Sequence, residues 1–217
     1  MKISPRTLQI LKVFSGINSN VLLTEGNKIR TYSAAKTVYA EAEVEENFPV
    51  NFGIYDLNQF LGVVGLFQDP SIEFEETAAT IQAGKNEVRY LPADESALIV
   101  PKKAFVPTEP LVQFNLEPAD LNAVIKAAGV LKAPYVSFIG ENGFVSLVAH
   151  DKTNVNSNNF SVEVAESSID FEYHVKTEFL TKLLAEKFDV HVLDKNRLLF
   201  NGDGKLYMIA ADTDSKI

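Results

Sequence analysis

The sequence predicts an α+β fold built from two similar domains, each with two helices packed on antiparallel sheets. The first observation is the stretch 52–67, where a β-rich segment runs into a helix with a single apolar face. The second is that residues 171–184 repeat this succession, with Phe179 aligned on Phe60 at an offset of 119 residues. The third is that most of the remaining chain alternates with the period of a strand. Two copies of one unit are the simplest organisation.

Composition limits the classes of protein to which the chain can belong. It has 217 residues, 46% hydrophobic and 23% charged, and it has no cysteine, so a disulfide framework and thiolate metal sites are excluded. No apolar run approaches the ~20 residues that span a bilayer, and the N-terminal segment lacks the apolar region of a signal peptide. We therefore expect a cytoplasmic protein that does not enter a membrane. The net charge of −9 argues against wrapping of nucleic acid by the whole surface, so any DNA contact needs a local basic patch.

In the first half, Ser4 is the predicted N-cap of a helix and Pro5 its first residue, where a missing N–H costs nothing. The predicted buried stripe is Leu8, Leu11 and Phe14, flanked by Thr7 and Ile10. Asp56 is the predicted cap of the second helix, whose apolar face is Leu57, Phe60, Leu61 and Val64. Strands are expected at 21–23, 29–32, 38–44, 48–55, 72–75, 78–83 and 88–91.

A proline-rich segment separates the halves. Pro92, Pro101, Pro107 and Pro110 are unsuited to a central strand and typical of a connector. We predict an N-terminal domain at 1–94, a connector at 95–110 and a C-terminal domain at 111–217.

The second half repeats the pattern. A third helix begins at Glu117-Pro118, which aligns with Ser4-Pro5, and its predicted inward residues are Leu121, Val124 and Ala128. A fourth helix follows a possible cap at Thr177, with Phe179, Leu180, Leu183 and Leu184 as its apolar stripe. Strands are expected at 135–139, 144–149, 159–165, 169–175, 190–193, 197–200 and 206–211.

No constellation of catalytic residues is apparent. The three histidines, His150, His174 and His191, lack metal-binding spacing, and the GxSxG and phosphate-binding glycine motifs are missing. Asp212 and Asp214 could hold a cation weakly, but a solvated tail is the preferred interpretation. We therefore predict a protein that is not an enzyme and needs no cofactor or metal.

Several segments resemble the sliding clamps, or DNA polymerase processivity factors, of T-even-type bacteriophages. The residues that carry the resemblance are Lys2-Ile3-Ser4, Leu11-Lys12, Phe14, Ile17-Asn18-Ser19, Tyr39-Ala40-Glu41-Ala42, Ile54-Tyr55-Asp56-Leu57-Asn58, Phe60-Leu61-Gly62, Pro92-Ala93-Asp94, Pro101 and Lys103. The second half matches mainly in pattern, at Asp120-Leu121, Lys126 and Leu131.

This resemblance implies a DNA-clamp fold in which three subunits of two domains form a ring, with helices lining the interior and sheets outside. Duplex DNA passes through the ring without sequence recognition, the replicative DNA polymerase is tethered to it, and an ATP-dependent clamp loader opens it. The late transcription machinery is a further candidate partner. The location implied is the bacterial host cytoplasm. The alternatives are a monomeric β-rich protein-interaction adaptor and a single-strand binding module.

The resemblance directs attention to basic residues on helix faces turned away from the sheets. The candidate DNA-facing residues are Arg6, Lys12, Lys126, Lys132, Lys182 and Lys187. The competing interpretation is that lysines simply cover exposed helix faces. In the same way, Glu41, Glu43 and Glu45 are interpreted as a solvated sheet face and not as a metal site.

A second candidate site lies at the connector. Phe105, Val106, Leu111 and Val112 could line a groove for a polymerase peptide, or they could seal the junction between the domains. For contacts between subunits, the candidate edge strands lie at 78–91 and 135–149.

Overall fold

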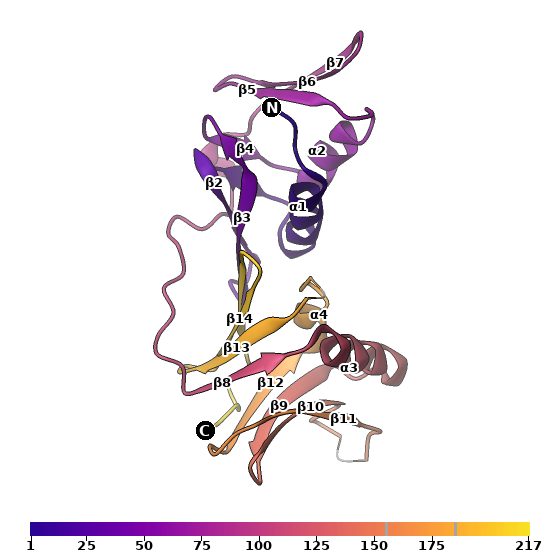
Figure 1. Ribbon diagram of the computed structural model, residues 1–217, viewed down its shortest axis with the longest axis vertical. Helices are drawn as coiled ribbons and strands as arrows, with labels where there is room; N and C mark the ends of the chain where they lie inside the picture. The colour runs from indigo at the N-terminus through magenta and orange to yellow at the C-terminus, as the bar shows by residue number, and fades with distance from the viewer. Residues whose placement is uncertain (155, 185) are drawn as a thin grey trace. The chain divides into compact units, whose positions relative to one another are not determined.

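A computed structural model describes residues 1–154, 156–184 and 186–217. The chain divides into two compact units, Met1–Phe105 and Val106–Ile217 (Figure 1). The boundary falls inside the predicted connector at 95–110, and the limits of that connector stay a prediction. None of the described helices has the length and apolar character needed to cross a bilayer.

The first unit contains two helices that pack side by side, and α1 lies on β2 and β3 (Figure 1). Strands β1 to β4 pair in the order β4-β1-β2-β3, and β5 to β7 pair as a separate antiparallel meander. Its elements are α1 (Pro5–Ile17), β1 (Val21–Leu23), β2 (Gly26–Tyr32), β3 (Val38–Phe48), β4 (Phe52–Ile54), α2 (Leu57–Val64), β5 (Ser71–Phe74), β6 (Ala79–Ala83), β7 (Asn86–Tyr90) and the 3₁₀ turn η1 (Glu95–Ala97).

The second unit has the same layers. Strands β9 to β12 pair in the order β11-β10-β9-β12 with α3 packed on them, and β8 pairs with β13 beside β14 and β15. Its elements are β8 (Val112–Leu116), α3 (Pro118–Leu131), β9 (Tyr135–Glu141), β10 (Phe144–His150), β11 (Phe160–Glu166), β12 (Phe171–Lys176), α4 (Thr177–Leu180), β13 (Phe188–Leu193), β14 (Arg197–Gly202) and β15 (Lys205–Ala210).

The two units share one topology, which confirms the predicted duplication. Each runs helix, four strands, helix, three strands, and in each the four strands after the first helix pair in the same order. The first unit even has a counterpart of β8, because Met1 exchanges backbone hydrogen bonds of 2.7 Å with Ile72 of β5 in both directions. The predicted α+β fold with two similar halves is therefore correct.

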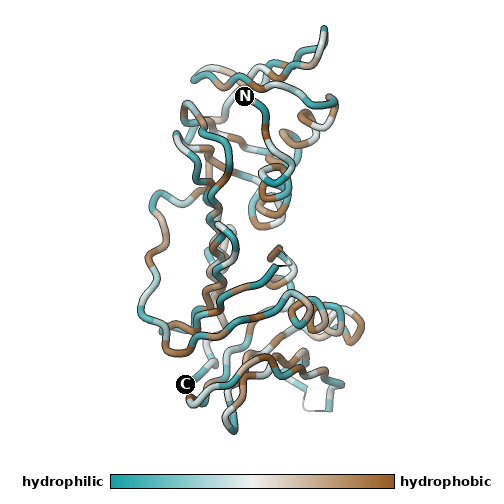
Figure 2. The backbone as a smooth tube through the Cα atoms, in the orientation of Figure 1, coloured by the Kyte–Doolittle hydropathy of each residue, from teal (hydrophilic) through white to brown (hydrophobic). Residues whose placement is uncertain are grey.

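Aromatic side chains fill much of both cores. In the first unit the ring of Phe52 lies 5.2 Å from that of Phe74, and Phe60 lies 5.2 Å from Tyr90, both edge to face. In the second unit Phe200 meets a second phenylalanine, Phe188, in the same geometry at 5.8 Å. Figure 2 shows apolar and polar residues alternating along the strands, as sheets with one covered face require.

Several details of the predicted elements differ from the structure. The stripe of α1 is shifted, because Thr7 and Ile10 are fully buried while Leu8 is only half-buried. The strand predicted to end at residue 44 continues to Phe48, and a bulge in its pairing with β2 absorbs the misfit. Strand β8 was not expected, because five residues flanked by prolines give a weak periodic signal.

The largest difference is at the fourth helix. α4 is only four residues long, and Leu183 and Leu184 lie beyond it, half-buried. Thr177 is its first residue and not its cap, since its hydroxyl donates to the carbonyl of Ala133 at 2.8 Å. With no side-chain cap, the helix leaves its first N–H groups to other partners and ends after one turn.

Candidate nucleic-acid interface

Helix α1 presents the clearest basic face. Arg6 and Lys12 are its charged residues, and Lys12 is exposed on the side opposite the buried Leu11 and Phe14. The helix is fixed at its start by Ser4, whose hydroxyl accepts from the amide of Thr7 at 3.2 Å, as predicted. These positions place positive charge on the helix layer of a protein whose net charge is −9.

Helix α3 carries the corresponding residues in the second unit. Lys126 is exposed in mid-helix, opposite the buried Val124 and Ala128. Lys132 is the C-cap, with a left-handed φ of 54°, and its side chain is exposed. Both are free to swing toward an anion because each joins the backbone by a long flexible stem.

Lys182 and Lys187 do not lie on a helix, which corrects the sequence-based placement. Lys182 follows the end of α4 and lies 5.8 Å from the ring of Phe179. Lys187 precedes β13, and its Nζ is 2.6 Å from a carboxylate oxygen of Glu117. A lysine already paired with a carboxylate offers less attraction to a phosphate.

The predicted groove residues are distributed over the two units. Phe105 ends the first unit, where its amide donates to the hydroxyl of Tyr39 at 3.2 Å and the two rings lie 5.9 Å apart. In the second unit Val106 is 79% exposed and Leu111 is 42% exposed. Val112 is a buried residue of β8 and is not available to line an open groove. The groove stays a prediction for the other three residues.

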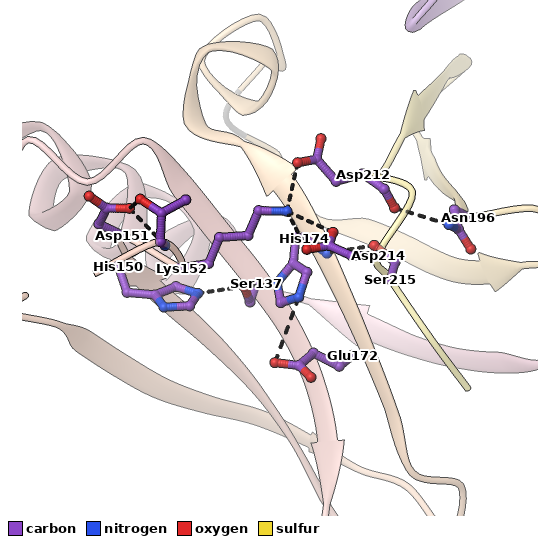
Figure 3. Close-up of polar contacts among 11 residues, drawn as sticks. Ser137, His150, Asp151, Lys152, Glu172, His174, Asn196, Asp212, Asp214 and Ser215 are labelled. Atoms are coloured by element: carbon purple, nitrogen blue, oxygen red, sulfur yellow. Dashed lines mark hydrogen bonds and ion pairs between the residues drawn. The ribbon is translucent and has the colours of Figure 1, made fainter. Parts of the chain in front are cut away.

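The structure brings together two histidines that the sequence had left apart. Ser137 Oγ lies 2.7 Å from His150 Nε2 and 2.6 Å from His174 Nδ1, and His174 Nε2 is 3.8 Å from Glu172 (Figure 3). A serine between imidazoles is an arrangement that nucleophilic catalysis uses. Here the side chain of Ser137 is fully buried, so no substrate can reach its oxygen.

The acidic residues near the C-terminus also have a structural role. Lys152 Nζ lies 2.7 Å from Asp212 Oδ2 and 2.7 Å from Asp214 Oδ1, so both aspartates are paired with a lysine (Figure 3). The side chains of Asp212 and Asp214 nevertheless keep 30% and 60% of their surface exposed, which agrees with the predicted solvated tail. No group of histidine and acidic side chains with the arrangement of a metal site occurs among the described residues.

The comparisons with known proteins agree with one another on the kind of protein that this chain resembles. Residues 2–100 match the family model described as DNA polymerase processivity factor. The sliding clamp of Vibrio phage KVP40 is 29% identical over 220 residues, covering 98% of this chain and 99% of that protein. The sliding clamp of Escherichia phage RB69 is 28% identical over 154 residues, covering 70% of this chain and 68% of that protein.

Solved structures extend the likeness to the whole fold. Proliferating cellular nuclear antigen from Entamoeba histolytica superposes with a TM-score of 0.69 at 11% identity, covering 94% of both chains. The beta clamp of H. pylori superposes with a TM-score of 0.75 at 13% identity. That superposition covers 98% of this chain but only 65% of the beta clamp. Together with the sequence matches, these likenesses show that the chain is similar to the phage sliding clamps and has the DNA-clamp fold.

Proposed function

We propose that this protein is a sliding clamp, which encircles duplex DNA as a ring and tethers the replicative DNA polymerase for processive synthesis. The observation that supports this most is the tandem clamp unit itself, two copies of one topology with a helix layer in each. A ring needs a repeated unit because each copy has to present the same face to the DNA.

Encirclement explains how an acidic protein can stay on DNA and still move. A good base contact is worth about 1–3 kcal/mol and would hold the protein at one sequence. Phosphate contacts carry no sequence information and permit sliding. In this proposal the helix layer, with Arg6, Lys12, Lys126 and Lys132, faces the phosphates, and Lys182 and Lys187 are secondary candidates.

Ring closure requires surfaces that join subunits, and the edge strands are candidates. Strand β7 ends the three-stranded sheet of the first unit, and β11 ends the four-stranded sheet of the second. Of the strands predicted for this role, β9 and β10 are interior to their sheet, so β11 replaces them. A β7 edge of one subunit pairing with a β11 edge of the next would give a head-to-tail contact, which can close a ring.

Exposed apolar side chains occur in both units, and one of them lies beside the β11 edge. Val130 of α3 is 77% exposed and borders a hollow together with Phe160 of β11. In the first unit Leu66, which follows α2, is 74% exposed. Apolar side chains beside an open strand edge suit an interface between copies.

The proposal includes further expectations from the clamp family. Three subunits form the ring, an ATP-dependent clamp loader opens it, and the late transcription machinery is an additional candidate partner in the host cytoplasm. In this proposal the clamp itself catalyses nothing.

The assembly can be tested by measuring mass in solution by light scattering over a range of concentrations. We expect a trimer, and we expect Val130→Glu to shift the protein toward monomer because it would bury a charge at the interface. Val106→Glu is the control, since Val106 is equally exposed but belongs to neither edge strand.

Retention on DNA gives the second half of the test. Rings placed by a loader on circular DNA should remain bound and should run off after the DNA is linearised. A monomer at every concentration, with polymerase binding that does not depend on DNA topology, would instead establish the adaptor alternative. Tight binding to short single strands would favour the single-strand binding module.

A further inference from the structure

The C-terminal tail, residues 211–217, adds itself to the free edge of β12. The amide of Asp212 donates to the carbonyl of His174 at 2.8 Å, and the amide of His174 donates to Ser215 Oγ at 3.0 Å. Further along, Glu172 and Lys216 exchange backbone hydrogen bonds of 2.8 and 2.9 Å as an antiparallel bridge. The tail therefore satisfies the outward backbone groups of a strand that ends its sheet.

The tail is held mainly by polar contacts. None of the side chains at 212–217 is buried, so the hydrophobic effect contributes little to its docking. Instead Lys152, only 13% exposed, reaches Asp212 and Asp214 (Figure 3). Its Nζ also lies 4.6 Å from the centre of the Tyr135 ring. Burial alone would lower the pKa of Lys152, but the hydrogen bonds to the two aspartates raise it overall. The Lys152 ammonium therefore stays charged at neutral pH.

The end of the tail lies over a hollow that it fills incompletely. The hollow is about 420 Å³ and is bordered by three carboxylates, those of Glu141, Asp170 and Glu172. Lys216 Nζ lies 3.1 Å from Glu172 Oε2, while Ile217 is 58% exposed. A basic residue followed by an aliphatic one suits the charge and the unfilled space of this hollow.

The corresponding edge in the first unit is closed in a different way. The amide of Ala93 donates to the carbonyl of Gly53 in β4 at 2.8 Å, which is the counterpart of the tail on β12. There the chain continues into the next unit, so the covering segment cannot leave without moving the connector. The segment on β12 belongs to the same unit as the strand and is held mainly by polar contacts, so it can be exchanged without moving the connector.

We propose that the β12 edge is a strand-addition site for an extended basic segment of a partner protein, which the chain's own tail covers at rest. The partner segment places a lysine or arginine against Glu172 and an aliphatic residue beside it, as Lys216 and Ile217 do. The partner displaces the tail by making the same backbone hydrogen bonds with better filling of the hollow. The site is formed within one unit, so it does not depend on ring closure.

The proposed site on the β12 edge can be tested with the tail sequence itself as a probe. A fluorescent peptide with the sequence of residues 211–217 is added to a protein shortened after Ala210, and binding is followed by fluorescence anisotropy. We expect the shortened protein to bind the peptide and the intact protein to bind it much more weakly, because its own tail competes. A peptide with Glu in place of Lys216 should bind roughly tenfold more weakly, because it loses a charge-assisted contact.

A measurement on the intact chain keeps the test valid if the shortened protein does not fold. In the full-length variant Lys152→Gln, amide exchange should speed up at Glu172, which bonds to the tail, and not at Tyr173, which faces β9. Two results would overturn the proposal. One is a folded shortened protein that ignores the peptide or binds the charge-reversed peptide equally well, and the other is a Glu172 amide that exchanges only when the whole unit unfolds.

Discussion

A single hydroxyl group shows how strongly the interior of the second unit constrains its titratable residues. Ser137 Oγ has one proton to donate but faces two imidazole nitrogens, at 2.7 Å on His150 and 2.6 Å on His174. At most one imidazole can therefore accept from it, and the other has to donate. The network favours particular tautomers and is sensitive to protonation.

This arrangement gives a pH prediction for His150. Burial lowers the pKa of His150 from its ordinary value of 6.5, and His174 lowers it further, against the opposing effects of Glu172 and Asp151. The unfolded chain therefore takes up this proton more readily than the folded chain. Stability from this residue is complete above pH 6.5 and is lost as the pH falls below it.

We expect His150→Gln to reduce the loss of unfolding free energy between pH 7.5 and pH 5, measured by urea denaturation at several pH values. His191→Gln is the control, since His191 lies outside the Ser137 network and is paired with Asp189 at 2.9 Å. Equal pH dependence in the wild type and in His150→Gln would show that burial of His150 does not set the acid response.

The sequence could not reveal this network because it depends on strand register. His174 lies directly opposite Ser137 across β12 and β9, although 37 residues separate them in the chain. Sequence periodicity shows which residues share a face, but it does not show which residues of two strands are paired. The helix caps at Ser4 and Asp56 were predictable because their partners lie three residues away.

At the scale of elements, local signals succeeded where they were strong. α1 and α2 begin where their caps predict, and the repeated strand-to-helix step is present in both units. The prediction of the fourth helix was wrong in length, because its apolar residues suit both a helix and a loop that covers the core. Only the packing of the chain around them decides between the two.

The segment at Ala93 that covers the edge of β4 leads to a prediction at the scale of elements. A Cβ added to Gly53 would overlap the carbonyl oxygen of Ala93 and lie 3.0 Å from Leu98 Cδ1. We expect Gly53→Ala to cost about 1–3 kcal/mol of unfolding free energy, because the segment around Ala93 has to move away from the strand. Urea denaturation measures the change.

Gly62 in α2 is the matched control. A Cβ there meets nothing within 4 Å, and the helical backbone accepts alanine, so Gly62→Ala should stabilise the protein by about 0.5–1 kcal/mol. If Gly53→Ala proved as stable as the wild type, the segment after β7 would not be a fixed cover of β4.

For the whole molecule, the sequence predicted the duplication better than the surfaces that use it. The repeat was visible because two copies share their order of helices and strands even where few residues are identical. The outermost strands of the sheets were not predictable, since an interior strand and an edge strand can have the same alternation. Strand β11 shows this, because Phe160, Val162 and Val164 alternate with Ser161 and Glu163 as in an ordinary sheet strand, although β11 ends its sheet.

The distribution of charge gives the last prediction, on how the protein holds DNA. If Lys12 and Lys126 contact phosphates, each lost contact should reduce the slope of log affinity against log salt concentration by about one. We therefore expect Lys12→Gln and Lys126→Gln to lower this slope. The slope is measured by fluorescence anisotropy with a short duplex between about 50 and 200 mM NaCl, where phosphate contacts weaken strongly with salt. Lys187→Gln should change it less, because Glu117 already pairs with Lys187 at 2.6 Å. Lys28→Gln on strand β2 is the control.

Retention on circular DNA should be the same in all four variants, since a closed ring is held by its topology and not by its affinity. A variant that loses both salt slope and retention on circles would show that adhesion, and not encirclement, keeps the protein on DNA.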